Sequence, residues 1–423
     1  MRYLIGFLVV SFVAIGSIFF ISAKNNAFEL VSDKYLPSAP EAQIIESSQI
    51  IEQKNFDIGP QKPLTIYHQT IKAIYATSWS ASSQKKIDYL IKLIKETELN
   101  AIVIDIKDYS GYIAYNIDLP EIEKYKAKEI RILKINSVIK QFHDEGIYVI
   151  ARITIFQDPI LAKARPDLAV HNKTKLTINY QLPTTNTLWL DHKNLSWIDP
   201  AAKEAWDYNI AIAKDAASRG FDEINFDYIR FPSDGDLNDM KFPFWNGTTP
   251  KNEVIKSFFK YLREQLPDVK ISADLFGLTT INNNDLGIGQ VIEDAYEYFD
   301  YVAPMVYPSH YAKMFLGYKN PAQYPYEVIK YSMDSALKRL QNYELGIKNN
   351  GTSTVTTANQ IHSSKLRPWL QDFDLGADYD AEMVKKQIQA VYDAASSTPE
   401  LINGWMMWNP KNIYTKEAFN EAE

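Results

Sequence analysis

The chain has 423 residues, 46% of them hydrophobic, a formal net charge of −7 and no cysteine. This length and hydrophobic content predict a folded protein with one large domain or two ordinary ones. The 45 Lys and Arg residues are scattered rather than clustered, so no binding surface for a nucleic-acid backbone is expected. The absence of cysteine excludes disulfides, thiolate zinc sites and cysteine nucleophiles.

The first predicted element is a hydrophobic segment over residues 1–23. After Arg2, the run from Tyr3 to Ala23 is uncharged and close to the ~20 residues that cross a bilayer. The run is longer than the core of a usual signal peptide, and its "ISA" end is a poor cleavage site, so we favour an uncleaved membrane anchor over a signal peptide. The positive-inside rule keeps Arg2 cytoplasmic, which predicts a single-pass protein of the cell membrane with the rest of the chain extracytoplasmic. A secreted protein is the alternative.

Residues 24–63 mix Ser, Pro, Glu and Gln without periodicity, and they predict a flexible linker. From residue 64 to 423, short apolar runs alternate with helical patterns. The runs that predict strands are 72–80, 100–111, 147–156, 223–231, 269–277, 300–308, 365–373 and 403–409. About eight strands separated by helices indicate the α/β class, and they favour a closed (β/α)8 TIM barrel over an open doubly wound sheet.

Helical patterns are predicted near 84–97, 127–145 and 201–219. Asp199 and Pro200 predict the N-cap and first turn of the third helix, and Gly220 its C-terminal end. Gly146 is predicted to end the second helix in the same way. The connection 157–199 is long, and in a barrel such an insertion is typical of the face that carries the active site.

The predicted strands end in polar residues, at the edge where barrel enzymes keep their working side chains. Alternation with a period of two predicts that Asp105 and Lys107 share one face of their strand. The same rule pairs Asn225 with Asp227. A single polar strand end has another explanation, because charged residues can pair with one another to close a barrel. Acids on several successive strands favour a site at the barrel mouth instead.

Two carboxylates beside a cleft with aromatic rings are the parts of a glycosidase. One acid protonates the leaving oxygen, and the other acts as nucleophile or activates water. Trp79, Trp369, Trp405 and Trp408 are candidate platforms for sugar rings, with a place in the core as the alternative for each.

Other chemistries lack their sequence signatures. The six histidines show no HxH or HExxH spacing, and no P-loop, GxGxxG or GxSxG motif is present. The stretch "DGDLND" (234–239) lacks the Gly and Glu of a calcium loop. We therefore expect no metal and no cofactor.

The stretch "GFDEINFDYIRFPSDG" (220–235) resembles the fourth-strand motif of a bacterial family of glycoside hydrolases, which are single-domain TIM barrels similar to the α-amylase-like barrels. The resemblance extends over about 70–415, through "AIVIDIKDYSGYIAY", "ISADLFG", "YVAPMVYPSHY", "LRPWLQDF" and "GWMMWN". It implies that Asp227 is the nucleophile and Asp274 the acid/base, although the donor in α-amylase-like barrels is usually Glu. Chitinase-like barrels carry a Glu where this chain has Ile229, so their substrate-assisted mechanism is not expected.

These observations predict a glycoside hydrolase anchored at the cell envelope, acting on an extracytoplasmic polysaccharide or oligosaccharide. This division of labour requires a lowered pKa at Asp227, with Arg230 supplying the positive charge, and a raised pKa at Asp274. The predicted substrate-binding residues are Asp105, Lys107, Arg152, Asn225, Arg230, Tyr307, Trp369, Gln371, Trp408 and Asn409. A non-catalytic carbohydrate-binding barrel and an anchored scaffold in envelope assembly are the alternative functions.

Overall fold

The computed structural model describes residues 57–65, 68–179, 183–350 and 364–422. The predicted anchor and most of the predicted linker lie outside these ranges. Within them, no helix is long and apolar enough to span a bilayer.

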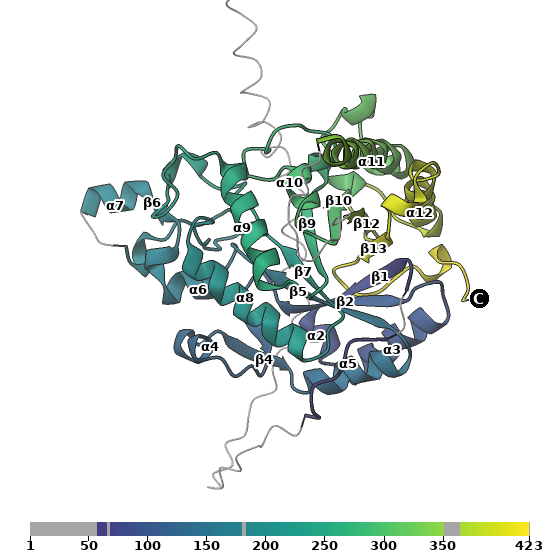
Figure 1. Cartoon of the computed structure of the whole chain (residues 1–423), viewed down its shortest axis with the longest axis horizontal. Helices are drawn as coiled ribbons and strands as arrows, with labels where there is room; N and C mark the ends of the chain where they lie inside the picture. Colours follow the sequence, from purple (N-terminus) through teal and green to yellow (C-terminus); the bar gives the residue numbers. More distant parts are fainter. Residues whose placement is uncertain (1–56, 66–67, 180–182, 351–363, 423) are drawn as a thin grey trace, which may run out of the picture.

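Eight parallel strands form a closed barrel (Figure 1). In chain order they are β1 (Ile71–Ala76), β2 (Ala101–Lys107), β5 (Tyr148–Thr154), β7 (Glu223–Asp227), β9 (Ile271–Phe276), β10 (Tyr301–Met305), β12 (Trp369–Gln371) and β13 (Gly404–Trp408). Each strand pairs in parallel with the next, and β13 pairs with β1, which closes the ring. All eight predicted strands are confirmed, as is the parallel barrel.

The remaining strands are short. They are β3 (Ile113–Tyr115), β4 (Lys128–Ile132), β6 (His171–Asn172), β8 (Met240–Lys241) and β11 (Lys365–Leu366). β3 pairs antiparallel with β2 and parallel with β4, so β4 runs opposite to the barrel strands. The helix predicted over 127–145 is therefore wrong in its first part. The "KEIRI" stretch of β4 is rich in helix-favouring charged residues, but its pairing with β3 decides its conformation.

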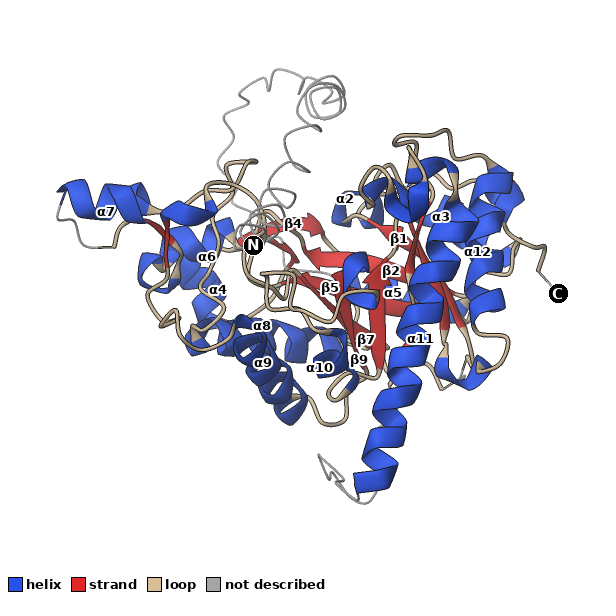
Figure 2. Ribbon diagram, turned by 90° about the horizontal axis from the view of Figure 1, so that it is seen from above, coloured by secondary structure: helices blue, strands red, loops and turns tan. Residues whose placement is uncertain are grey.

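The helices surround the strands in both views (Figures 1 and 2). They are α2 (Ser78–Ala81), α3 (Gln84–Lys95), α4 (Pro120–Tyr125), α5 (Ile135–Asp144), α6 (Pro159–Ala164), α7 (Lys173–Asn179), α8 (Lys203–Ser218), α9 (Lys251–Gln265), α10 (Ile292–Tyr296), α11 (Pro325–Asn350) and α12 (Ala381–Ala394). α3 shows why they pack. Its buried residues Ile87, Leu90, Leu93 and Ile94 recur at helical spacing and form one apolar face.

The helix ends agree with the sequence in part. Gly146 and Gly220 follow α5 and α8 with φ of 70° and 99°, the left-handed conformation that favours glycine. Asp199 is not the N-cap of α8, because that helix begins only at Lys203. The carboxylate of Asp199 instead accepts hydrogen bonds from the backbone N–H groups of Ala201, Phe244 and Trp245. It therefore fixes the long connection after β7 rather than the helix.

The barrel separates two apolar regions. The larger lies between strands and helices, and it includes Ile104, Phe226 and Leu275, as the alternation predicts. The smaller lies inside the barrel, with Ala73, Val103 and other small or β-branched residues from the starts of the strands. Because this interior is filled, the carboxyl end of the strands is where a TIM barrel is expected to bind a ligand.

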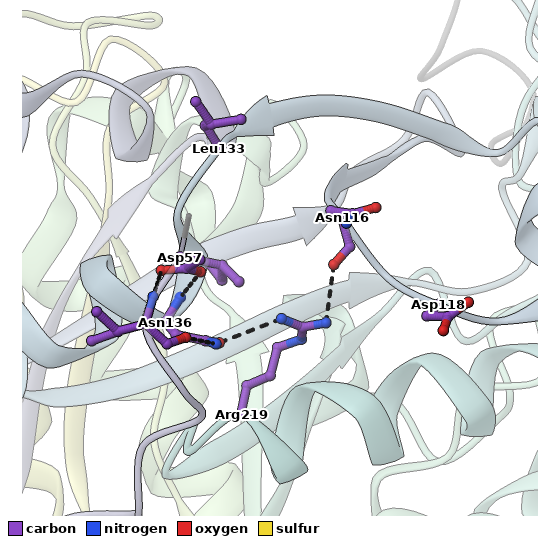
Figure 3. A pocket seen from close by; sticks show the side chains of 8 residues that line it. Asp57, Asn116, Asp118, Leu133, Asn136 and Arg219 are labelled. Carbon is purple, nitrogen blue, oxygen red and sulfur yellow. Dashed lines mark hydrogen bonds between the residues drawn. The ribbon is translucent and has the colours of Figure 1, made fainter. Parts of the chain in front are cut away.

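Residues 57–63, the end of the predicted linker, contact the amino-terminal side of the barrel domain. The carboxylate of Asp57 accepts hydrogen bonds from the first backbone N–H groups of α5, those of Asn136 and Ser137. Arg219 lies between the side chain of Asn136 and the backbone of Asn116 (Figure 3). Together with neighbours, these residues line a cavity of about 220 Å³. All of its groups lie away from the strand ends that carry the predicted acids.

Candidate active site

The centre of the candidate site is Arg152, the fifth residue of β5, which points into the barrel. Its Nη1 lies 2.5 Å from Asp105 Oδ1 on β2, and its Nη2 contacts Asp227 Oδ2 on β7. Its Nε lies 3.5 Å from Asp274 Oδ2 on β9. One guanidinium therefore contacts carboxylates from three neighbouring strands, and it brings together the two acids that the sequence singles out.

Asp227 ends β7, and the backbone turns sharply behind it. The next residue, Tyr228, has a left-handed backbone with φ of 53°, which is unfavourable for a side chain of this size. This turn lets the N–H of Tyr228 donate to Asp227 Oδ1 at 2.5 Å. Both carboxylate oxygens of Asp227 are thus held in place, one by the turn and one by Arg152.

Asp274 is more deeply buried, with 1% exposure against 5% for Asp227. Its Oδ1 accepts hydrogen bonds from Trp369 Nε1 at 2.7 Å and Asn225 Nδ2 at 2.9 Å. Burial, and next the negative charge of Asp227, raise the pKa of Asp274 to about 8. Asp274 therefore holds a proton at neutral pH, the state that a general acid needs.

Asp105 is the third carboxylate, and its partner Tyr75 is a residue that the sequence reasoning missed. The Tyr75 hydroxyl donates to Asp105 Oδ2 at 2.5 Å. Burial raises the pKa of Asp105, and the charge of Arg152 opposes this effect. Tyr75 follows Ala73 by two positions on β1, so alternation places it inside the barrel. β1 carries no acid that would have indicated the site, since its charged residue Lys72 pairs with Glu98.

Aromatic rings from β1, β12 and β13 cover one side of the carboxylates. Tyr75 and Trp408 stack with ring centroids 3.8 Å apart, and Trp369 meets both edge-on. The guanidinium of Arg152 lies 5.1 Å from the Trp408 ring. Tyr307 belongs to the same interior cluster, and burial followed by the charges of Asp274 and Asp227 raises its pKa. Trp369, Trp408 and Tyr307 are thus beside the acids.

Lys107 corrects one prediction. The pairing of β2 with β5 shifts between Asp105 and Lys107, so Asp105 is level with Arg152 whereas Lys107 is level with Ile153. Ile153 belongs to the region between strands and helices, and Lys107 follows it there. It forms a sealed ion pair with Asp158 at 2.8 Å. A β-bulge thus turns Lys107 away from the mouth.

Arg230 corrects a second prediction, because Arg152 and not Arg230 forms the ion pair with Asp227. The guanidinium of Arg230 is instead packed against aromatic rings, described below. Two further predicted residues hold loops. Gln371 accepts from Ser309 and donates to the Phe373 carbonyl, and Asn409 donates to the Asp372 and Ile413 carbonyls.

The other candidate tryptophans lie apart from the acids. Trp405 is fully buried and packs against Phe419 in the region outside the barrel. Trp79, in α2, is 60% exposed, and the guanidinium of Arg131 lies 5.0 Å from its ring. In the described part of the chain, no group of three or more His, Asp or Glu could hold a metal ion.

Comparison with known proteins identifies relatives. A family model described as "Putative glycosyl hydrolase domain" matches residues 73–414. No curated protein matched the chain. Among solved structures, a hypothetical protein from Ruminiclostridium thermocellum is 40% identical, with a TM-score of 0.42; the match covers 48% of this chain and 96% of that one.

Two further solved structures are more distant in sequence. The glycoside hydrolase domain of PgaB (BpsB) from Bordetella bronchiseptica is 13% identical, with a TM-score of 0.54 over 84% of this chain and 100% of that one. The α-galactosidase TtGalA from Thermus thermophilus is 11% identical, with a TM-score of 0.46 over 85% of this chain and 61% of that one. The match to the PgaB domain shows a shared fold.

Proposed function

Since the chain belongs to this family of glycosyl hydrolase domains, we propose that it hydrolyses a glycosidic bond with Asp227 as nucleophile and Asp274 as general acid. The observation that carries the proposal is the carboxyl pair on β7 and β9, held by one arginine and differing in environment. Two acids with divided roles are what glycoside hydrolysis requires.

The raised pKa of Asp274 supports its role as the proton donor. With a pKa of about 8, it carries a proton at neutral pH and can pass it to the glycosidic oxygen as the bond to the anomeric carbon breaks. The hydrogen bonds from Trp369 and Asn225 both reach Oδ1. That leaves Oδ2 as the oxygen for the proton.

Asp227 is the better placed of the two for attack. It is the more exposed acid, and the Tyr228 N–H and Arg152 fix both of its oxygens. Arg152 also contacts Asp105, so two carboxylates share its positive charge. The stacked pair of Tyr75 and Trp408 supplies flat apolar surface beside the acids, which suits the C–H face of a sugar ring.

The test is turnover of a panel of polysaccharides and oligosaccharides by the full-length protein, followed by release of reducing ends. The double variant Asp227→Asn/Asp274→Asn should release none, with an unchanged circular dichroism spectrum. Equal turnover by the double variant and the wild type would overturn the assignment. Binding of a glycan without any product from the wild type would indicate a carbohydrate-binding barrel instead.

We also propose that the segment 1–23 anchors the protein in the cell membrane and that the barrel faces outward. The uncharged run from Tyr3 to Ala23, preceded by Arg2, supports this orientation. In a bacterial host, the full-length protein should sediment with membranes, and added protease should digest the barrel in intact cells once an outer barrier is opened. Recovery of the protein in the cytoplasmic fraction would refute the proposal.

A further inference from the structure

A second buried arginine lies on the same face of the barrel as the candidate acids. Arg230 follows Asp227 by three residues, and 7% of it is exposed. Its guanidinium lies 4.7 Å from the ring centroid of Trp197, 4.7 Å from that of Phe276 and 5.2 Å from that of Tyr228. Phe276 ends β9 two residues after Asp274, so these rings hold Arg230 between the ends of β7 and β9.

Arg230 has no ion pair with any carboxylate of the described residues, unlike Arg152, which contacts three. Its one hydrogen bond to them runs from Nη1 to the Phe231 carbonyl at 3.0 Å. None of its other nitrogens is among the buried polar atoms that lack a partner, so the unbonded ones reach solvent. Aromatic rings therefore pack against the faces of the Arg230 guanidinium, while some of its N–H groups stay open to solvent.

Nearby acids do not fill that edge. Asp191, Asp227 and Asp234 act on Arg230 electrostatically, and burial lowers the pKa of the guanidinium. Asp191 is fully occupied, because its oxygens accept from Gln157, Trp197 and the backbone of residues 193 and 195. Asp227 is held by Arg152 and the Tyr228 N–H.

Although three acids lie near Arg230, none forms an ion pair with it, so a carboxylate bound directly to its open edge would compensate the buried charge better. A guanidinium with rings on its faces offers its N–H groups in one plane, and the planar carboxylate is the anion that fits this edge in bidentate fashion. We propose that Arg230 binds the carboxylate of a uronic acid residue, so that the substrate is an acidic polysaccharide. This inference rests on the proposed function, because it takes the barrel mouth as the glycan site.

The experiment compares oligosaccharides of polygalacturonate, alginate and hyaluronan with their carboxyl-reduced counterparts, and includes a sulfated neutral galactan. Calorimetry with the full-length protein in the Asp227→Asn background measures binding without consumption of the ligand. At least one uronate should bind about 10- to 100-fold more tightly than its reduced form, as expected for a charge-assisted hydrogen bond. Hydrolysis of the same panel by the protein with Asp227 intact is measured separately.

Variants identify the residue responsible. Arg230→Gln should abolish the preference for the uronate while leaving affinity for the reduced form within about threefold, and Arg230→Lys should retain part of the preference. Arg165→Gln is the matched control, because it removes an arginine of the 157–199 connection that pairs with Asp167 and Glu204 at the surface. Thermal melting of each variant shows that the fold is kept.

The outcomes separate the two proposals. Equal affinity for uronates and reduced forms, absence of uronate binding, a preference for the sulfated galactan, or an equal loss on both forms in Arg230→Gln would overturn the role of Arg230. Hydrolysis of neutral glycans alone would keep the proposed function and overturn this inference. Arg230-dependent binding of a uronate without hydrolysis of any glycan would keep the inference and overturn the proposed function.

Discussion

Two layers of charge lie inside the barrel, and they differ in balance. At the amino-terminal end, both carboxylate oxygens of Glu223 on β7 accept hydrogen bonds from Arg367 Nη1, at 2.9 and 3.0 Å. The other two guanidinium nitrogens of Arg367 donate to Asn403. The Tyr301 ring covers one face of this guanidinium, 3.8 Å from the ring centroid. Both charged residues are fully buried. One cation thus meets one anion, and the hydrogen bonds are complete.

At the carboxyl end, one cation meets three acids. Arg152 contacts Asp105, Asp227 and Asp274, and its Nε makes no hydrogen bond. Burial raises the pKa of Asp274, and the negative charge of Asp227 raises it further, because one guanidinium does not compensate three buried carboxylates. The balanced layer is what a structural ion pair looks like. In the unbalanced layer, Asp274 keeps a proton that it can transfer, which is typical of a catalytic site.

The largest expected effect is a loss of activity when the unbalanced layer at the carboxyl end is changed. Asp227→Asn removes the proposed nucleophile and should lower kcat on a substrate of the wild type by on the order of 10⁴-fold or more. The variant loses the bond from Arg152 to Asp227 Oδ2, but Arg152 keeps its ion pair with Asp105, so the effect on the melting temperature should be small beside the effect on activity. Steady-state kinetics and calorimetric melting check both. A loss of stability without a loss of specific activity would mean that Asp227 is structural and not catalytic.

A change in the balanced layer at the amino-terminal end should lower stability rather than activity. Glu223→Gln leaves Arg367 buried without a counter-charge, which should lower the free energy of unfolding by about 3–5 kcal/mol. The kcat per folded molecule should stay near that of the wild type. Urea unfolding gives the stability.

Two controls accompany that variant. Glu382→Gln breaks an exposed pair with Lys386 and should cost less than about 0.5 kcal/mol. The double change Glu223→Leu/Arg367→Met removes both charges but leaves the buried acceptors of Asn403 without their donor, so it should cost about 1–3 kcal/mol, less than Glu223→Gln. If the double variant were as unstable as Glu223→Gln, packing rather than the unpaired charge would explain the loss.

Asp274→Asn tests the proton itself. The loss in kcat/KM should be about 10²-fold at neutral pH, as expected for a general acid. In the wild type, kcat/KM should be level from neutral pH to about pH 8 and fall about tenfold per pH unit above it, because the acid then loses its proton. The variant should lack this fall. An alkaline fall at the same pH in both proteins would assign it to another group.

The same carboxyl predicts the sign of the pH dependence of stability. Its pKa is higher in the folded protein than the ordinary value of about 4, so the folded state binds more protons between about pH 4 and pH 8. Asp274 therefore makes the fold less stable as the pH rises through that range. At pH 9, the melting temperature of Asp274→Asn should equal or exceed that of the wild type. A lower value would mean that ionised Asp274 stabilises the barrel.

The sequence predicts the barrel well because its signals are local. Each strand is an apolar run bounded by turn residues, and alternation correctly places Asp227 and Asn225 inside. The direction of Lys107 was not predictable in this way, since a single bulge between β2 and β5 reverses it. Polar residues at the strand ends predicted the site, and the family resemblance selected Asp227 and Asp274 as its acid pair. The sequence analysis expected a raised pKa at Asp274 from its proposed role, but the cause, burial beside Asp227, depends on the three-dimensional structure.

Partnership between distant residues is the other limit. The sequence offered Arg230 as the partner of Asp227 because the two are three positions apart. The structure gives that place to Arg152, 75 residues earlier in the chain. Likewise, Glu223 and Arg367 are 144 residues apart, and neither was predicted to matter. Which charge meets which depends on the closure of the ring, and a single sequence carries no local trace of it.

The smallest predicted effect sharpens the comparison most directly, because it alters one hydrogen bond in the unbalanced layer. The Trp369 indole donates to Asp274 Oδ1, and this bond lowers the pKa of Asp274 against the effect of burial. Trp369→Phe should therefore move the alkaline fall in kcat/KM upward by less than about one pH unit. Trp405→Phe is the control, because it removes an indole that bonds to Tyr392 outside the barrel. A shift in the control of the same size would show that the fall reflects general loosening of the core, whereas a shift confined to Trp369→Phe would tie it to the carboxyl that the unbalanced charge keeps protonated.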